Sequence, residues 1–257
     1  MKDVALITGA SSGIGLELAK IHAAKRRDLI LVARRLNRLE ELKEELSSKY
    51  GVEVMVIEKD LSKIHAATEL YEIIKETGVE IDYLINNAGF GGHGRFHERD
   101  WDRDFAMIQL NIAALAELTR CFLPEMVARK KGRVLNLASM AAFLPGPYQA
   151  VYYATKAFVL SFSEAIASEL DGTGVTVTAL CPGPTKTEFE QVADVTGTKA
   201  FMINASVRSV ATYGYAAMMR GQAVAVPGTT NRLLVHYLLR MTPKKVARRV
   251  SKLLMEK

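Results

Sequence analysis

Cysteine and long apolar runs are the features this sequence most clearly lacks. It has two cysteines in 257 residues, Cys121 and Cys181, and both lie in apolar stretches. This indicates buried free thiols in a reducing compartment, and it argues against a disulfide framework or a metal cluster. No window reaches the roughly 18 uninterrupted apolar residues that a membrane-spanning helix needs. The opening MKDVALITGA is not typical of a signal peptide. We therefore expect a cytoplasmic protein.

Net positive charge is confined to the C-terminal tail. The net charge is +6, and residues 230–257 hold eight lysines and arginines against one glutamate. The remainder of the chain is therefore close to neutral, with a net charge of −1. Only Tyr237 interleaves an aromatic ring with the basic residues of the tail, so nucleic-acid binding is not expected.

Apolar residues in the tail recur at helical spacing. They are Val246, Val250, Leu253 and Leu254. One interpretation is an amphipathic helix that lies on an anionic membrane surface, which would make the cytoplasmic protein peripheral to the membrane. The other is a helix that packs on the body of the protein or on a partner subunit.

Short apolar runs alternate with longer helical patterns along most of the chain. The runs that we predict to be strands are 4–8, 29–34, 52–60, 81–89, 132–139, 175–183 and 222–228. The segments that we predict to be helices are 13–26, 38–50, 62–77, 101–130 and 150–170. Wholly apolar strands that alternate with helices are typical of a parallel sheet covered on both faces. We expect a single α/β domain over residues 1–257 with a doubly wound, Rossmann-type sheet in three layers, and a helical excursion at 185–220.

A glycine-rich loop, TGASSGIG, joins the first strand to the first helix. Its candidate contacts to a dinucleotide are Gly9, Ser11, Ser12, Gly13, Ile14 and Gly15. Glycine allows the backbone to turn tightly and to approach a pyrophosphate, and the helix N-terminus offers free N–H groups. An ordinary tight turn has the same composition, so the position directly after the first strand is what favours a nucleotide site.

The end of the second strand favours NADP(H) over NAD(H). NAD enzymes usually carry an acidic residue there, which holds the ribose hydroxyl. Here Ala33 occupies that place, and Arg34, Arg35 and Arg38 follow. An arginine can hold a 2′-phosphate with two hydrogen bonds, so we expect Arg34 in that role, with Arg35 a secondary choice. The alternative is a solvated basic start to a helix.

Six motifs in order resemble the short-chain dehydrogenase/reductase family. They are TGASSGIG (8–15), NNAG (86–89), Asn111, Ser139, YYATK (152–156) and PG (182–183). The resemblance covers about residues 4–190. Within the family, the stretches LVARRLNRLEEL and FLPGPYQAVYYATKAFV are similar to bacterial reductases of unassigned substrate and to the hydroxysteroid and 3-ketoacyl reductase branch. The resemblance implies an NADP(H)-dependent oxidoreductase that acts on a carbonyl or alcohol, and a homodimer or homotetramer paired through helices near 101–130 and 150–170.

Tyrosine needs help to act as an acid or base, because its unperturbed pKa is about 10. A nearby lysine ammonium favours the phenolate and lowers that pKa. Tyr152 and Tyr153 lie four and three residues before Lys156, so helical spacing allows either. The family pattern Y-x-x-x-K selects Tyr152. Ser139, which lies 13 residues before Tyr152, supports that choice by the family's own spacing and is placed to stabilise charge on the substrate oxygen.

The resemblance also assigns roles to a helical asparagine and to residues at the other strand ends. Asn111 is expected to bend its helix and hold a water that relays protons to Lys156, although a satisfied core asparagine is the alternative. Asp60 is expected to accept from the adenine amino group. The alternative is that Asp60 or Ser62 caps a helix, and both roles could hold. The full set of expected cofactor contacts beyond the glycine loop and the two arginines is Asp60, Leu61, Asn87, Ala88, Gly89, Tyr152, Lys156, Pro182, Gly183, Thr185 and Thr187.

No metal site is expected. His93 and His97 are spaced like a pair of ligands, but no third ligand is evident, so both are expected at the surface or at the rim of the substrate site. The segments 140–148 and 188–215, which should bound that site, are mainly apolar. They favour an apolar carbonyl substrate.

Two other classes of function compete with a reductase. A non-catalytic NADP-binding redox sensor or scaffold would not need an intact Asn111, Ser139, Tyr152 and Lys156. An epimerase or dehydratase of the extended branch shares the tyrosine–lysine chemistry. The chain is short for that branch and lacks its large C-terminal substrate domain.

Overall fold

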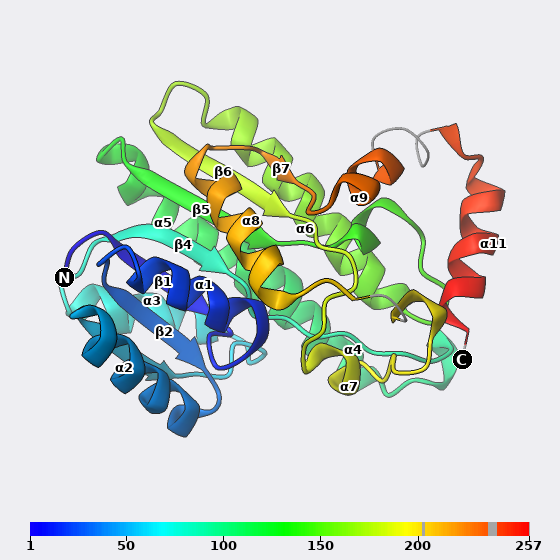
Figure 1. Cartoon of the computed structure of the whole chain (residues 1–257), viewed down its shortest axis with the longest axis horizontal. Coiled ribbons are helices and arrows are strands. Elements are labelled where there is room, and N and C mark those ends of the chain that lie inside the picture. The colour runs from blue at the N-terminus through cyan, green and yellow to red at the C-terminus, as the bar shows by residue number, and fades with distance from the viewer. Residues whose placement is uncertain (202–203, 236–240, 257) are drawn as a thin grey trace.

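A seven-stranded parallel sheet forms the centre of the computed structural model, which describes residues 1–201, 204–235 and 241–256 (Figure 1). The strands are β1 (Val4–Thr8), β2 (Leu29–Ala33), β3 (Val54–Glu58), β4 (Ile81–Asn86), β5 (Gly132–Leu137), β6 (Val175–Leu180) and β7 (Val224–Ala225). Their order is β3-β2-β1-β4-β5-β6-β7, so the direction of winding reverses between β1 and β4. The predicted doubly wound parallel sheet is confirmed. Parts of the predicted 185–220 excursion and of the basic tail, including Tyr237 and Lys257, lie outside the described residues.

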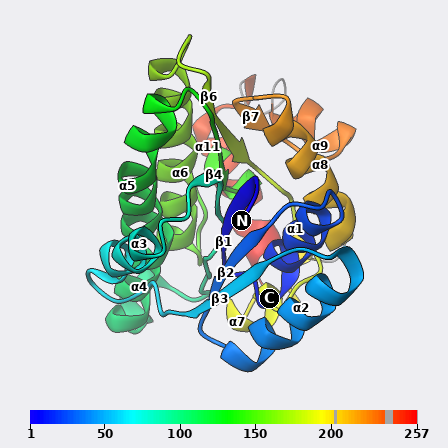
Figure 2. The same cartoon turned by 90° about the vertical axis from the view of Figure 1, so that its left-hand side faces the viewer.

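Helices cover both faces of the sheet, as Figure 2 shows end-on. The longer helices are α1 (Gly13–Ala23), α2 (Leu36–Tyr50), α3 (Ala66–Glu76), α4 (Trp101–Ile108), α5 (Leu115–Ala128), α6 (Ala150–Glu169), α8 (Val207–Met219) and α11 (Lys244–Met255). The short helices are α7 (Phe189–Val192) and α9 (Thr229–Leu233). One core cluster joins the sheet to α1, α2 and α8, and a second joins it to α3 and α5. The buried strands therefore have apolar contacts on both sides, which is why they appear in the sequence as unbroken apolar runs.

The helical segment from α4 to α5 is continuous but irregular. A π-helical turn, Gln109–Ala114, joins the two helices. By length and composition alone the segment Trp101–Ala128 could cross a membrane. This was not expected from the sequence, because polar residues interrupt the apolar run. Its apolar side chains Leu118, Phe122 and Met126 are buried against the sheet, and this contact accounts for the composition.

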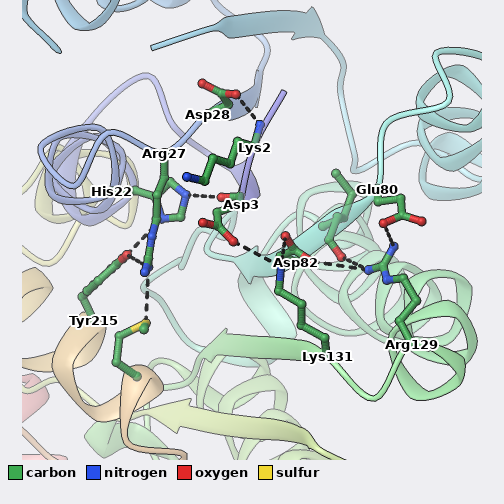
Figure 3. Close-up of polar contacts among 12 residues, drawn as sticks. Lys2, Asp3, His22, Arg27, Asp28, Glu80, Asp82, Arg129, Lys131 and Tyr215 are labelled. Atoms are coloured by element: carbon green, nitrogen blue, oxygen red, sulfur yellow. Dashed lines mark hydrogen bonds and ion pairs between the residues drawn. The ribbon is translucent and has the colours of Figure 1, made fainter. Parts of the chain in front are cut away.

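A polar network ties down the amino-terminal edge of the sheet (Figure 3). The Lys131 ammonium bridges the carboxylates of Asp3 and Asp82, at 3.1 and 2.9 Å. Burial lowers the pKa of His22 to about 4, so its ring is neutral. Its Nε2 must donate to the carbonyl oxygen of Asp3, at 2.9 Å, and its Nδ1 then accepts from the hydroxyl of Tyr215, at 3.0 Å. The charged and polar groups described here all have hydrogen-bond partners within the network, so we assign the network a structural role.

Candidate active site

The loops that follow β1, β4, β5 and β6 meet at the carboxyl edge of the sheet. Open α/β sheets bind ligands at this edge, near the point where the strand order reverses. The loop after β1 is the glycine loop, and Asn87 directly follows β4. Ser139 lies two residues beyond β5, and residues 182–187 follow β6. The sheet therefore gathers the predicted site residues from four distant parts of the sequence.

Close backbone approach explains two of the loop glycines. The Asn87 amide nitrogen donates to the carbonyl oxygens of Thr8 and Gly9, at 2.9 and 3.1 Å. A Cβ atom at Gly15 would lie 2.5 Å from the Gly9 oxygen and 2.4 Å from the Asn87 amide nitrogen. Gly9 itself has a φ of 66°. These two hydrogen bonds of Asn87 join the loops after β1 and β4. Ala88 shares in this contact, because its N–H donates to the Thr8 hydroxyl at 3.0 Å.

The two arginines after β2 point to different places. The Arg35 guanidinium donates to the hydroxyls of Ser11 and Ser12, at 3.1 and 2.9 Å. Arg34 is exposed and lines a surface cleft of about 480 Å³ that Asp60 also lines. The structure therefore places Arg35 on the glycine loop and Arg34 beside the predicted adenine-contacting turn.

Asp60 forms a local turn and does not cap α3. Its carboxylate accepts from the backbone N–H and the hydroxyl of Ser62, at 3.1 and 2.7 Å. Helix α3 begins at Ala66, and its N-cap position is His65. The capping alternative is therefore wrong, because the chain makes a separate turn before the helix begins. Burial raises the pKa of Asp60, but the bonds from Ser62 outweigh it, and the net shift is downward. The neighbouring Leu61 is buried in the core.

Ser139, Tyr152 and Lys156 converge beside the end of β5. Tyr152 is buried on α6, and the Ser139 side chain is close enough to its phenol to influence the phenol's pKa. The Lys156 ammonium donates to the carbonyl oxygen of Leu137 at 2.6 Å and lies 5.9 Å from the centroid of the Tyr152 ring. The three predicted groups thus share one small volume.

The pKa shifts in this group follow burial. Burial raises the pKa of Tyr152, and interaction with the Ser139 side chain only partly opposes it. Burial lowers the pKa of Lys156 to about 8. The expectation that Lys156 lowers the pKa of Tyr152 is wrong in this structure. The ammonium is directed at the Leu137 carbonyl, and desolvation of the phenol dominates.

Tyr153 faces another part of the molecule. A Cβ atom at Gly146 would lie 2.2 Å from an atom of the Tyr153 ring, so the ring lies flat against that glycine. Burial raises the pKa of Tyr153, and interaction with the Ser251 hydroxyl of α11 opposes the shift. The rings of Tyr152 and Tyr153 are nearly perpendicular, at 75°. Helical spacing allowed both tyrosines, but only Tyr152 reaches Ser139.

Asn111 holds the segment that follows β4. Its amide nitrogen donates to the Phe90 carbonyl and the Thr155 hydroxyl, at 3.0 and 3.1 Å, and its Oδ1 accepts from the Phe90 N–H at 3.2 Å. The expected local bend is present as the π-helical turn. Gly89 lies between the two partners of the expected relay, because a Cβ there would be 2.9 Å from Asn111 Oδ1 and 3.6 Å from Lys156 Nζ. The water relay itself remains a prediction.

The loop after β6 folds back over the glycine loop. The Pro182 carbonyl accepts from the Met140 N–H at 2.9 Å, and the Thr185 hydroxyl donates to the Gly183 carbonyl at 2.9 Å. A Cβ at Gly13 would lie 3.3 Å from the methyl group of Thr187. Thr187 therefore packs on the glycine loop, where the expected cofactor contacts from the loops after β1 and β6 meet.

Aromatic and apolar side chains enclose the other side of Tyr152. The Phe189 ring lies 5.2 Å from the Tyr152 ring and stacks on Phe201 at 6.3 Å. Met255 of α11 is buried in the adjoining apolar cluster. Sequence reasoning missed α11 as a wall of this region. Helix α11 lies about 100 residues after Tyr152 in the sequence. Its inward face is marked by Ser251 and Met255, which are four residues apart and buried in the structure.

The candidate histidines and cysteines have ordinary surroundings. His93 stacks on Tyr148, and its Nε2 lies 2.8 Å from the Met255 carbonyl oxygen. His97 is exposed beside Glu98. In the described part of the chain, no three histidine, cysteine, aspartate or glutamate side chains gather in a way that could hold a metal. Both cysteines are free, and Cys121 is only partly buried, contrary to expectation.

Comparison with known proteins matches residues 3–196 to a family model described as short chain dehydrogenase. An uncharacterized oxidoreductase of Myxococcus xanthus is 36% identical over 185 residues, which are 72% of this chain and 73% of that protein. The NADP-dependent 3-hydroxy acid dehydrogenase of Schizosaccharomyces pombe is 36% identical over 192 residues, 73% of each chain. The solved short-chain dehydrogenase from Sphingobium yanoikuyae in complex with NADPH is 32% identical, with a TM-score of 0.83 over 92% of this chain and 90% of that one.

Proposed function

Because the chain belongs to the short-chain dehydrogenase family, we propose that it is an oxidoreductase that uses NADP(H) to interconvert a carbonyl and an alcohol. The observation that carries the proposal is the convergence of Ser139, Tyr152 and Lys156 beside the glycine loop. The bound cofactor would supply the hydride, and the protein would supply the proton and the positioning.

The residues present fit a dinucleotide. Close packing leaves no space for a Cβ at Gly15, so the start of α1 can pack directly on Gly9 and Asn87, as in a dinucleotide-binding loop. Helix α1 begins at Gly13, and its first N–H groups have no partner within the helix. Arg34 lines the cleft that it shares with Asp60, and Arg35 lies against Ser11 and Ser12 of the glycine loop, so both could bind a phosphate. We propose the contacts predicted from the sequence as the cofactor site, with Arg35 as strong a candidate as Arg34.

Tyr152 is proposed as the proton donor to the substrate oxygen. Its raised pKa keeps the phenol protonated at neutral pH, which suits the donor of a reduction better than the base of an oxidation. The Ser139 side chain lies near the phenol, and its hydroxyl can bond a substrate oxygen placed beside Tyr152. With a pKa of about 8, Lys156 is mostly protonated at neutral pH and can hold an anionic or hydroxyl group near Tyr152.

Paired tyrosine variants test this assignment. We expect Tyr152→Phe to reduce carbonyl reduction by about 10²- to 10⁴-fold, the usual contribution of a positioned acid, with NADPH binding nearly unchanged. Tyr153→Phe is the matched control and should have a mild effect, because Tyr153 faces Gly146 and Ser251. Oxidation of NADPH with a panel of aldehydes, ketones and ketoacyl thioesters measures both. A larger loss for Tyr153→Phe would contradict the assignment.

An apolar substrate is proposed from the walls of the site. Phe189, Phe201 and the apolar residues around Tyr152 offer contact area, while the polar groups are confined to the Ser139 side. The panel described above should therefore favour extended or ring-containing ketones over small charged aldehydes. A preference for small anions would count against this.

Self-association is proposed through α4 and α6. Trp101, Phe105 and Phe158 are large apolar side chains that remain 57%, 42% and 39% exposed. They lie on the helices that the resemblance expects to pair subunits. Light scattering on the full chain should give a dimer or tetramer, and Trp101→Glu should reduce its mass.

Helix α11 carries an exposed apolar stripe beside a basic face. The exposed apolar side chains are Val246, Val250, Leu253 and Leu254. The exposed basic side chains are Lys245, Arg248, Arg249 and Lys252. On the opposite side Ser251 and Met255 are buried, so the helix packs on the body and presents the stripe outward. Both interpretations of the tail therefore have a structural counterpart.

An anionic membrane surface is the partner proposed for this stripe. Apolar side chains flanked by cations complement acidic headgroups, whereas a symmetric contact between two copies would bring like charges together. Vesicles with and without phosphatidylglycerol measure the binding. Leu253→Asp should abolish it, and Ile73→Asp, an exposed site on α3, should not. Binding that is absent, or equal for neutral and anionic vesicles, would refute the membrane contact.

A further inference from the structure

Glu188 joins the substrate-side loop to the arginines that follow β2. Its two carboxylate oxygens accept from Arg38 Nη1 at 2.7 Å and from Arg35 Nη1 at 2.9 Å. The three side chains are 40–45% exposed, so water reaches them. Burial raises the pKa of Glu188, but the bonds from Arg38, Arg35 and Ser12 outweigh it and leave the pKa below its ordinary value. The carboxylate is therefore ionised at neutral pH.

The same arginine is bound to the glycine loop. While one nitrogen of Arg35 holds Glu188, its other nitrogens donate to Ser11 and Ser12. Glu188 thus provides the anion for a cationic group next to the loop where a dinucleotide phosphate would bind. A phosphate that bound there would have to compete with this carboxylate.

The residue after Glu188 covers the catalytic tyrosine. The Phe189 ring lies 5.2 Å from the Tyr152 ring, and it fills the space beside Gly91, where a Cβ would lie 2.7 Å from a ring atom. The Val192 N–H donates to the Glu188 carbonyl at 3.1 Å, and the Ala193 N–H donates to the Phe189 carbonyl at 2.8 Å. These bonds place Glu188 and Phe189 in one short helical turn, so displacement of one moves the other.

We propose that Glu188 is a cofactor-sensitive latch: a phosphate of NADP(H) displaces its carboxylate from Arg35 and Arg38, and the release moves Phe189 away from Tyr152. The proposal rests on the proposed cofactor. A phosphate monoester carries up to about two negative charges and three acceptor oxygens, against one charge for the carboxylate. Ion pairs between half-exposed side chains are weak, so the exchange is within reach of such a ligand. The latch would couple cofactor binding to access of the substrate to Tyr152.

Binding measurements on the full chain test the competition. Glu188→Gln keeps the shape of the side chain and removes its charge. We expect it to tighten NADP⁺ binding by about three- to tenfold, the range that two half-exposed ion pairs can supply. Glu190→Gln is the matched control, because Glu190 bonds Asn204 and is not paired with either arginine. It should leave NADP⁺ affinity unchanged.

The source of the competing phosphate is distinguished by two fragments. Adenosine 2′,5′-bisphosphate carries the 2′-phosphate without the pyrophosphate, and ADP carries the reverse. Whichever phosphate occupies the arginines should bind more tightly to Glu188→Gln than to the unchanged protein. An unchanged or weaker affinity of Glu188→Gln for all of these ligands overturns the latch while the proposed function stands. If the unchanged protein binds none of them, the proposed function fails as well.

Hydrogen exchange reports the movement of Phe189. The amides of Val192 and Ala193 are held by Glu188 and Phe189 in this structure. NADP⁺ should speed their exchange in the unchanged protein. In Glu188→Gln their exchange should already be fast without NADP⁺. Exchange that slows equally in both proteins when NADP⁺ binds would overturn the coupling to Phe189.

Discussion

A Lys156→Met substitution would isolate what burial of this amine does to stability. Lys156 is 5% exposed, and burial lowers its pKa from 10.5 to about 8. Below pH 8 both the folded and the unfolded chain bind the proton, and the folded state carries a constant desolvation penalty. Between pH 8 and pH 10.5 the Lys156 amine is protonated only in the unfolded chain, so the free energy of unfolding rises with pH. Across this pH range the free energy of unfolding should rise by about 3 kcal/mol, since each unit of pKa shift corresponds to about 1.36 kcal/mol.

The assay compares the two proteins at several pH values. Chemical denaturation at pH 7 and pH 10 should show the unchanged protein gaining about 2.5 kcal/mol relative to Lys156→Met. Groups that titrate in this range and do not interact with Lys156 are present in both proteins and largely cancel in the difference. At pH 7 the variant loses the bond to the Leu137 carbonyl, which costs about 1–3 kcal/mol. The variant also avoids the desolvation penalty of the buried ammonium, which is about as large as the cost of the lost bond. We therefore expect Lys156→Met to be at least as stable as the unchanged protein at pH 7.

Parallel stability curves would refute this reasoning. If the difference between the two proteins stays constant from pH 7 to pH 10, the folded pKa of Lys156 is not lowered. The amine would then have to be solvated or paired with an anion. A difference that falls as pH rises would mean a raised pKa, and the carbonyl bond to Leu137 would not describe its environment.

Three further predictions concern the proposed site. Arg34→Ala should weaken NADPH binding far more than NADH binding in titration calorimetry, and an equal loss would exclude a contact to the 2′-phosphate. Gly15→Ala should lower the melting temperature, because its Cβ would lie 2.5 Å from the Gly9 carbonyl oxygen and overpacking of this kind costs about 1–3 kcal/mol; an unchanged melting temperature would contradict the close packing. The value of kcat/KM for reduction should fall as pH rises through about 8, where Lys156 loses its proton, and a flat profile up to pH 9.5 would show that the ammonium is not needed.

Much of the fold was predictable because its signals are local. Buried parallel strands are wholly apolar, helices repeat at their own period, and a glycine loop directly after the first strand is a short, continuous signal. Each of the seven observed strands lies within its predicted range, and the last is only Val224–Ala225. The convergence of Ser139 with Tyr152 was also predictable, through a family spacing that reflects one strand, one turn and one helix.

Other features depended on contacts that no short stretch encodes. Tyr152 and Tyr153 differ only by one position on α6, and the packing of that helix against β5 decides which one faces Ser139. The direction of the Tyr152 pKa followed from burial, which is a property of the assembled core. The sequence offered Asp60 as a helix cap, but α3 begins further on, at Ala66.

The sequence by itself determined the succession of strands and helices along the chain, the glycine loop and the types of residue at each strand end, because these depend on neighbours within a few positions. Only the tertiary structure decided the partners of the charged groups. Arg38 meets Glu188 across 150 residues, and Arg35 meets the glycine loop and Glu188 at once. Hydrogen bonds and ion pairs act over a few ångströms in space, so their partners are defined only when the sheet has brought distant loops to one edge.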